Sequence, residues 1–311
     1  MPNLHDIEKR INSVQSTKQI TRTMEMVSAA KIRSAGERVW NALPWSLNIS
    51  EMLINTAKHA PRSAEALLAD RDEIKKTLIV VITSDRGLAG GFSTNVIRAA
   101  ERIMKQKQAE GVEVEIVACG KKAITYFNYR GIEPVLEFRD LSADPTYDEA
   151  TEISEYSGDG YHYDRLDEVI LIYNHAKNAA EQTVIEQRVL PIDYTAFADV
   201  LGLTKKEEDV LAPYRTPEGE KHYEEVDVDF EPSPEYVLQH LMPAYLRNTY
   251  YYALIDSAAA EQAARRSAMK SATDNATEMV DTLNRLYNRV RQSAITTEIS
   301  EIVGGAAALE D

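Results

Sequence analysis

The segment SDRGLAGGFSTN, residues Ser84–Asn95, is the part of the sequence nearest in character to a phosphate-binding loop. It lies between an expected strand and an expected helix, where backbone amides at a helix N-terminus can hold an anion. However, it matches neither G-x-x-x-x-G-K-[ST] nor G-x-G-x-x-G, and no lysine follows its glycines directly. A tight strand-to-helix turn accounts for the same residues, and phosphate binding remains the alternative.

The other chemistry-bearing side chains form no catalytic or metal-binding pattern. The six histidines have no metal-ligand spacing, and no G-x-S-x-G motif marks a serine nucleophile. Cys119 is the only cysteine and ends an expected buried strand, so we expect a packed thiol rather than a reactive one. We therefore predict no catalytic residue, no cofactor and no metal ion.

Composition and charge exclude several classes of protein. The chain has 311 residues, 44% hydrophobic and 27% charged, which is typical of globular proteins. At ~150 residues per domain, we expect about two structural units. The net charge of −15 argues against nucleic acid as a partner, because phosphate backbones are bound by clustered basic residues. The longest aliphatic run, Leu78–Ile82, is far shorter than the ~20 residues that span a bilayer.

The first 43 residues predict a long helix with a coiled-coil seam. Its apolar positions are spaced 3, 4 and 3 residues apart at Leu4, Ile7, Ile11 and Val14. The same register then lands on four polar residues: Lys18, Thr21, Glu25 and Ser28. We therefore expect the register to break after Val14, and a shifted stripe of Ile20, Met24 and Val27 to replace it. Pro44 is expected to kink or end the helix near Leu43.

The C-terminal third predicts a second long helix, which begins at the cap Ser233-Pro234-Glu235. Three unbroken heptads predict its seam at Met269, Ala272, Ala276, Met279, Leu283, Leu286 and Val290. Beyond Val290 the seam positions are polar, and a different apolar stripe appears at Ile295, Ile299 and Ile302. Such a helix tip must contact something other than its coiled-coil partner. Gly304 is expected to end the helix.

The middle of the chain predicts a mainly parallel, Rossmann-like α/β domain. Expected strands alternate with a helix at Thr94–Ala109. The strands are Thr77–Asp85, Val112–Gly120, Val169–Asn174 and Thr183–Ile192. The fold class is thus α/β plus an antiparallel coiled coil of the two end helices. We place the boundaries at 1–60 for the first helix, 61–232 for the α/β domain with an acidic loop at 199–232, and 233–311 for the last helix.

Three segments of the sequence resemble the gamma subunit of the rotary F-type ATP synthase. They are Lys9–Arg33, Ser84–Phe92 and Ala263–Leu309. The last contains the family's I-T-x-E-x-x-E-x-x-x-G-A signature as Ile295, Thr296, Glu298, Glu301, Gly305 and Ala306. The resemblance covers the whole chain in the order helix, α/β domain, helix.

This resemblance implies a mechanical part rather than an enzyme. The paired helices would form a shaft inside a ring of three alpha and three beta subunits, and the α/β domain would lie against the epsilon subunit and the c-subunit ring. Rotation of the c ring would then drive ATP synthesis. Membrane association would occur only through the complex, at the cytoplasmic face of a bacterial cell membrane.

The resemblance also implies which residues contact the partners. Arg291 and Gln292 match a pair that meets the catalytic ring, and Thr296 and Glu298 match neighbours with similar contacts. Met24 matches a shaft position near the moving lever of a beta subunit. Glu231 matches the foot region that touches the c ring.

Two other hypotheses stay open from the residues alone. The first is a nucleotide- or phosphate-binding α/β protein with coiled-coil arms, for which the loop Ser84–Asn95 is the only support. The second is a passive coiled-coil scaffold unrelated to rotation.

Overall fold

The chain divides into two compact units, residues 1–28 with 266–311 and residues 29–265, which we call unit 1 and unit 2. The computed structural model describes residues 3–57, 59–60, 66–141, 144–178, 181–192 and 229–310. Two long helices, α1 (Leu4–Ala57) and α7 (Pro234–Glu310), contribute to both units. Most of the acidic loop 199–232, up to residue 228, lies outside the described residues.

Unit 2 is built around a five-stranded sheet with the strand order β3-β2-β1-β4-β5. The first four strands are parallel and β5 is antiparallel to β4. The strands are β1 (Lys76–Ile82), β2 (Glu113–Cys119), β3 (Leu136–Phe138), β4 (Glu168–Ala176) and β5 (Gln182–Leu190). Around them lie α2 (Phe92–Ala109), α3 (Lys121–Tyr129), α4 (Tyr147–His162) and the short 3-10 helix η2 (Ala66–Leu68).

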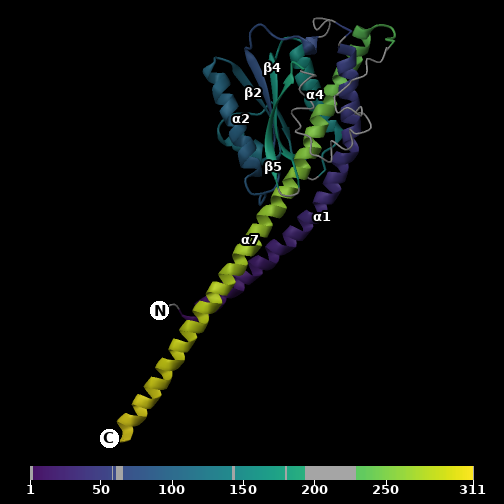
Figure 1. Cartoon of the computed structure of the whole chain (residues 1–311). Helices are drawn as coiled ribbons and strands as arrows, with labels where there is room; N and C mark the ends of the chain where they lie inside the picture. The colour runs from purple at the N-terminus through teal and green to yellow at the C-terminus, as the bar shows by residue number, and fades with distance from the viewer. Residues whose placement is uncertain are drawn as a thin grey trace, which may run out of the picture. The chain divides into compact units, whose positions relative to one another are not determined.

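The side chains of β1 alternate between two hydrophobic cores, as those of a strand covered on both faces must. Ile79 and Val81 pack in the core that contains α2 and α3. Leu78 and Val80 point the other way, into the core that α4 shares with the unit 2 parts of α1 and α7. Figure 1 shows α2 on one side of the sheet and α4 on the other.

The expected sheet is confirmed, with four predicted strands and the helix before the second strand found within a few residues of their expected places. Four of the described elements were not predicted: η2, α3, the three-residue strand β3, and α4. The start of α4 does carry a sequence signal, since Thr146 and Glu149 form a capping box.

Proline and glycine end the long helices less readily than expected. Of the two effects expected of Pro44, a kink or a helix end near Leu43, the helix end is wrong, because α1 continues through Pro44 to Ala57. Leu43, Ile49 and Leu53, on either side of the proline, are buried in one core, which stabilises the helix despite the missing N–H group. Gly304 does not end α7 either, since the helix reaches Glu310; the alanines at 306–308 favour continuation.

The expected start of α7 is confirmed. The helix begins at Pro234, and the hydroxyl of Ser233 accepts a hydrogen bond from the backbone N–H of Tyr236. Proline in the first helical position needs no hydrogen-bond acceptor for its nitrogen, and a preceding serine caps the free N–H groups.

Unit 1 consists of the first turns of α1 and the last turns of α7. Figure 1 shows the two segments side by side with opposite chain directions, with α7 extending beyond the N-terminus of α1. The expected antiparallel coiled coil is therefore present in this unit.

Candidate functional site

The seam between α1 and α7 in unit 1 includes polar residues that the sequence analysis placed outside it. Thr21 and Ser28 are 8% and 2% exposed, whereas Ile20 and Val27 are 60% and 51% exposed. The heptad register of α1 therefore continues through the polar positions, and the predicted shift to another stripe is wrong. Met24 lies beside this seam and is half-buried.

A hydrogen bond explains why threonine is accepted in the seam. The hydroxyls of Thr21 and Thr273 lie 2.8 Å apart, and each also lies within hydrogen-bond distance of a backbone carbonyl of its own helix. Since each hydroxyl has one proton, one donates to its partner and the other donates to its own carbonyl. Buried hydroxyl groups with such partners avoid the cost of desolvation without a hydrogen bond. The two helices are thus held together partly by a polar contact that an apolar pattern cannot reveal.

The seam of α7 is also only partly as predicted. Its more buried side runs along Met269, Thr273, Ala276, Val280, Leu283, Tyr287 and Val290. Met279 and Leu286, which were predicted in the seam, are 53% and 38% exposed. The predicted and observed seams share Met269, Ala276, Leu283 and Val290. The other three positions are displaced by one residue, to Thr273, Val280 and Tyr287.

Beyond Val290 the surface of α7 is exposed on all sides, up to Val303. Arg291, Gln292, Thr296 and Glu298 all lie on this tip and are exposed, as the sequence analysis implies for contacts with other chains. The hydroxyl of Thr296 donates to the carbonyl of Gln292, and the guanidinium of Arg291 lies 6.0 Å from the ring centre of Tyr287. Their partners stay predictions.

The same tip exposes an apolar stripe. Ile295, Ile299 and Ile302 are 47%, 55% and 66% exposed. Branched aliphatic side chains at helical spacing on a solvent-facing tip are typical of a surface that another protein covers. The tip therefore combines the four named polar residues with an apolar face.

Glu231 lies in unit 2, just before α7 begins, and its side chain is exposed. It therefore lies in a different unit from Met24 and the α7 tip.

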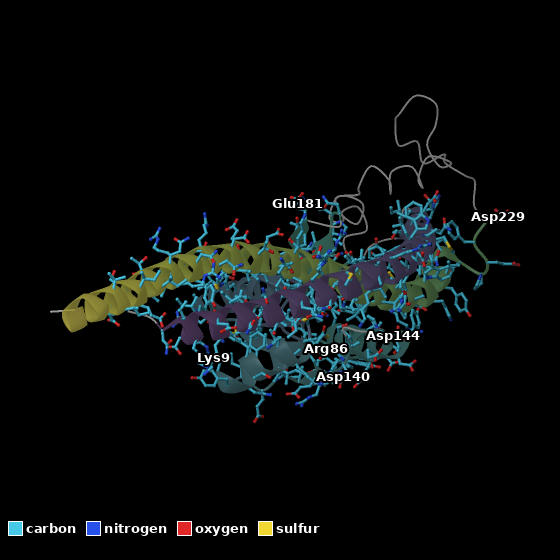
Figure 2. The ribbon with its side chains drawn as sticks, turned by 90° about the horizontal axis from the view of Figure 1, so that it is seen from below. Lys9, Arg86, Asp140, Asp144, Glu181 and Asp229 are labelled. Carbon is cyan, nitrogen blue, oxygen red and sulfur yellow. The ribbon has the colours of Figure 1, made fainter. Side chains whose placement is uncertain are left out.

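The loop between β1 and α2, proposed above as a possible phosphate site, contains an acidic side chain, which disfavours a bound anion. Asp85 accepts hydrogen bonds from the backbone N–H groups of Lys121 and Asp140, both at 3.0 Å. It thereby satisfies a free amide at the start of α3. Arg86 is exposed, on the side of unit 2 where Asp140 also lies (Figure 2).

The crevice above the sheet at this loop is filled by the chain itself. In doubly wound sheets, ligands bind at the carboxyl ends of the strands where the strand order reverses, which is between β1 and β4 here. Ala89 and Phe92 of this region pack against Ala260 and Ala264 of α7. A cavity of about 10 Å³ remains at the ends of β1 and β2, which has room for about one water molecule.

Buried polar side chains connect α7 to the edge of the sheet beside this crevice. His175, near the end of β4, lies with Nδ1 2.7 Å from Oδ2 of Asp256. Arg265 contacts Glu261 one turn before it and donates to the carbonyl of Gly87 at 3.4 Å. The sequence analysis missed these contacts. Acidic residues in an alanine-rich helix, such as Asp256 and Glu261, are typical of exposed positions, and nothing in the sequence indicates that these two are buried.

A second cavity, of about 210 Å³, lies at the opposite edge of the sheet and is lined partly by Lys76, Glu115 and Tyr156. Its lysine is already paired: the ammonium group of Lys76 contacts Glu115 and Glu113, at 2.7 and 3.0 Å. Hydrogen bonding to these carboxylates raises the pKa of Lys76. Arg165 also lines this cavity.

Within the described ranges, no group of three or more His, Cys, Asp or Glu side chains is arranged to hold a metal ion. Among the helices in this same part of the chain, none has an apolar stretch long enough to cross a bilayer.

Comparison with known proteins gives matches along the whole chain. A family model described as ATP synthase matches residues 3–309. The ATP synthase gamma chain of Cytophaga hutchinsonii is 39% identical over 315 residues, covering 100% of both chains. That of Pelotomaculum thermopropionicum is 39% identical over 310 residues, again covering 100% of both.

Solved structures show the same fold. A chain of the Euglena gracilis mitochondrial ATP synthase, from a structure of OSCP, F1 and the c ring, matches with a TM-score of 0.62 and 18% identity, covering 98% of this chain and 94% of that one. A chain from the central stalk and c ring of the Tetrahymena thermophila enzyme matches with a TM-score of 0.56 and 26% identity, covering 81% of this chain and 99% of that one. The long helices, the α/β sheet and the full-length matches together identify the chain as a member of the ATP synthase gamma chain family.

Proposed function

We propose that this chain is the central rotor stalk of an F-type ATP synthase. It would couple ion-driven rotation of the c ring to the conformational cycle of the three catalytic sites in the alpha/beta hexamer. The observation that carries the proposal is the match to gamma chains over 100% of this chain and 100% of the relative.

The α7 tip supports contact with a surrounding ring of subunits. An exposed helix end with isoleucines on one side and charged or polar groups on the others suits a partner that covers it on several sides. We assign the ring contacts to Arg291, Gln292, Thr296 and Glu298, and to Met24 of α1. A rotor can shift the beta subunits only if it interacts differently with their alternative states.

The foot of the stalk would lie in unit 2. We assign the contact with the c ring to Glu231, which is exposed at the start of α7, and a further contact to the epsilon subunit. The chain would be peripheral at the cytoplasmic face of a bacterial membrane, held there through the complex. In this role it performs no catalysis itself.

The test is to purify the chain from its native membranes, through a tag inserted in the acidic loop 199–232, and to measure the subunit stoichiometry by intact-complex mass spectrometry. We expect one copy with three alpha and three beta subunits. A second preparation, tagged on the beta subunit, controls for interference by the first tag. A lone monomer or a homo-oligomer in both preparations would contradict the proposal.

A further inference from the structure

The α7 segment from Tyr252 to Arg265 is buried at every residue. A helix at the surface of a globular unit normally buries one stripe, and a helix buried all round lies within a core. Here the segment lies entirely in unit 2, where it packs with the sheet and with α1. In the proposed stalk, this is the stretch where α7 is enclosed by the unit that receives the force of the c ring.

From Ala258 to Ala264 the apolar side chains of this contact are all small: Ala258, Ala259, Ala260, Ala263 and Ala264. The larger buried apolar side chains of the segment, Tyr252, Leu254 and Ile255, come before this stretch. Alanines permit close approach, but a single methyl group interlocks little with its neighbours, unlike the larger knobs of a coiled-coil seam. The alanine stretch alone therefore resists rotation or sliding of the helix only weakly.

One polar pair crosses the same contact with defined geometry. The side chains of His175 and Asp256 are 3% and 2% exposed, and Nδ1 and Oδ2 lie 2.7 Å apart. The other oxygen of Asp256 accepts the backbone N–H of Ala176 at 3.3 Å. The carboxylate of Asp256 thus contacts β4 through two consecutive residues, which fixes both the height and the angle of α7 at this point.

The backbone around His175 is itself held to the loop that follows β1. The preceding residue, Asn174, is 1% exposed and donates from its side-chain amide to the carbonyl of Phe92 at 3.0 Å. Asp256 therefore contacts a part of the sheet that is anchored to both β4 and the start of α2. Buried polar pairs contribute little net stability because both groups lose water, and their best-attested effect is to select one register.

We propose that His175 and Asp256 are positioning residues that lock α7 to the sheet of unit 2, so that torque passes from this unit into the helix without slip. The inference rests on the proposed rotor function. It predicts that losing the pair lowers the efficiency of coupling, whereas losing a buried pair elsewhere in unit 2 lowers only the stability of the chain.

The experiment compares His175→Leu with His175→Asn in the assembled complex in membrane vesicles. Asparagine can place a side-chain donor near the position of Nδ1, whereas leucine cannot donate. The readout is the number of protons pumped per ATP hydrolysed. We expect His175→Leu to lower this ratio about twofold or more, and His175→Asn to restore it toward the wild-type value.

Lys107→Met provides a matched control for stability. Lys107 and Glu168 form another largely buried ion pair, with side chains 14% and 9% exposed, and it joins α2 to β4 without involving α7. We expect this variant to lower the melting temperature and to leave the pumping ratio unchanged. An equal fall of the ratio in Lys107→Met and His175→Leu would overturn the proposal, since general loosening of unit 2 would then explain both.

If His175→Leu does not assemble, Asp256→Ala replaces it. This variant removes both the contact with His175 and the acceptor for the N–H of Ala176. A wild-type pumping ratio in an assembled variant lacking the pair would refute the lock and leave the rotor function intact. If the rotor function itself is wrong, the stoichiometry measurement described above will show it, because the wild-type complex will then not contain one copy of the chain.

Discussion

At the scale of single residues, Cys119 shows how burial sets chemistry. It lies at the carboxyl end of β2 with 0% exposure, and burial raises the pKa of its thiol. The expected packed thiol is therefore confirmed. Because the thiolate is the reactive form, we expect no modification of the native chain by a thiol reagent at pH 8, and complete modification in urea.

The same pKa shift predicts how stability depends on pH. The thiol of the unfolded chain ionises above about pH 8.5, while the folded chain keeps its proton to higher pH. The stabilising contribution of the buried, protonated thiol is therefore fully present below about pH 8.5. Above this pH, the free energy of unfolding falls by ~1.4 kcal/mol per pH unit. Urea unfolding of wild type and Cys119→Ala between pH 7.5 and 10 tests this. Equal pH dependence of the two proteins would contradict it.

The sequence predicts some of the proposed functional residues and not others. Arg291, Gln292 and their neighbours were found because a specific motif surrounds them and because the seam ends just before them. His175 and Asp256 carry no such signal. Sequence periodicity assumes that a helix has one exposed face, and this assumption fails for a segment buried all round.

At the scale of elements, the seam of unit 1 shows where hydrophobic patterning misleads. Both helices keep the 3-4 spacing, but some seam positions carry polar residues, and apolar residues such as Ile20 lie outside it. A pattern search for apolar residues then shifts to the wrong stripe. The strands were easier to predict, since short continuous aliphatic runs with flanking turn residues are typical of buried strands.

The contact between Thr21 and Thr273 predicts a non-additive pair of substitutions. Thr21→Val or Thr273→Val alone removes one hydrogen bond across the seam and should cost about 1 kcal/mol. The double variant should recover much of that cost, because the two valines then pack against each other. Thermal unfolding of the isolated chain, monitored by helical circular dichroism, gives the comparison. Strictly additive losses would show that the two hydroxyls act independently.

The exposed tip of α7 predicts a truncation that separates folding from function. A chain ending at Gln292 lacks Thr296, Glu298 and the isoleucine stripe, none of which is buried in unit 1. We expect the melting temperature of the isolated chain to stay nearly constant, because surface changes alter stability by only ~0.5 kcal/mol. Coupled ATP synthesis by the assembled complex should fall strongly. Normal synthesis would contradict the contacts assigned to Thr296 and Glu298.

At the scale of the whole molecule, the alternation of strands and helices predicted the sheet. The motifs of three segments, which occur in the order helix, α/β domain and helix, predicted the family. Whether the sheet binds a ligand could not be predicted in the same way. A Rossmann-like sheet is compatible with nucleotide binding, and only the packing of Ala260 and Ala264 against Phe92 closes the crevice where a ligand would lie.

The closed crevice predicts that the isolated chain does not bind nucleotides there. A cavity of about 10 Å³ cannot accept ATP, ADP or phosphate. Isothermal titration calorimetry with each of the three should therefore show no saturable heat. Saturable binding that is lost on substitution of Arg86, in the loop after β1, would revive the hypothesis of a nucleotide-binding protein.

The hydrogen bond between Thr21 and Thr273 joins residues 252 positions apart in the chain. During synthesis, α1 leaves the ribosome long before its partner exists, and at ~5–20 residues per second the delay is roughly 13–50 s. For that time the apolar seam residues of α1 are exposed and able to join the wrong helix. Unit 1 is thus the last part of the chain that can fold, because it requires residues from both ends of the chain.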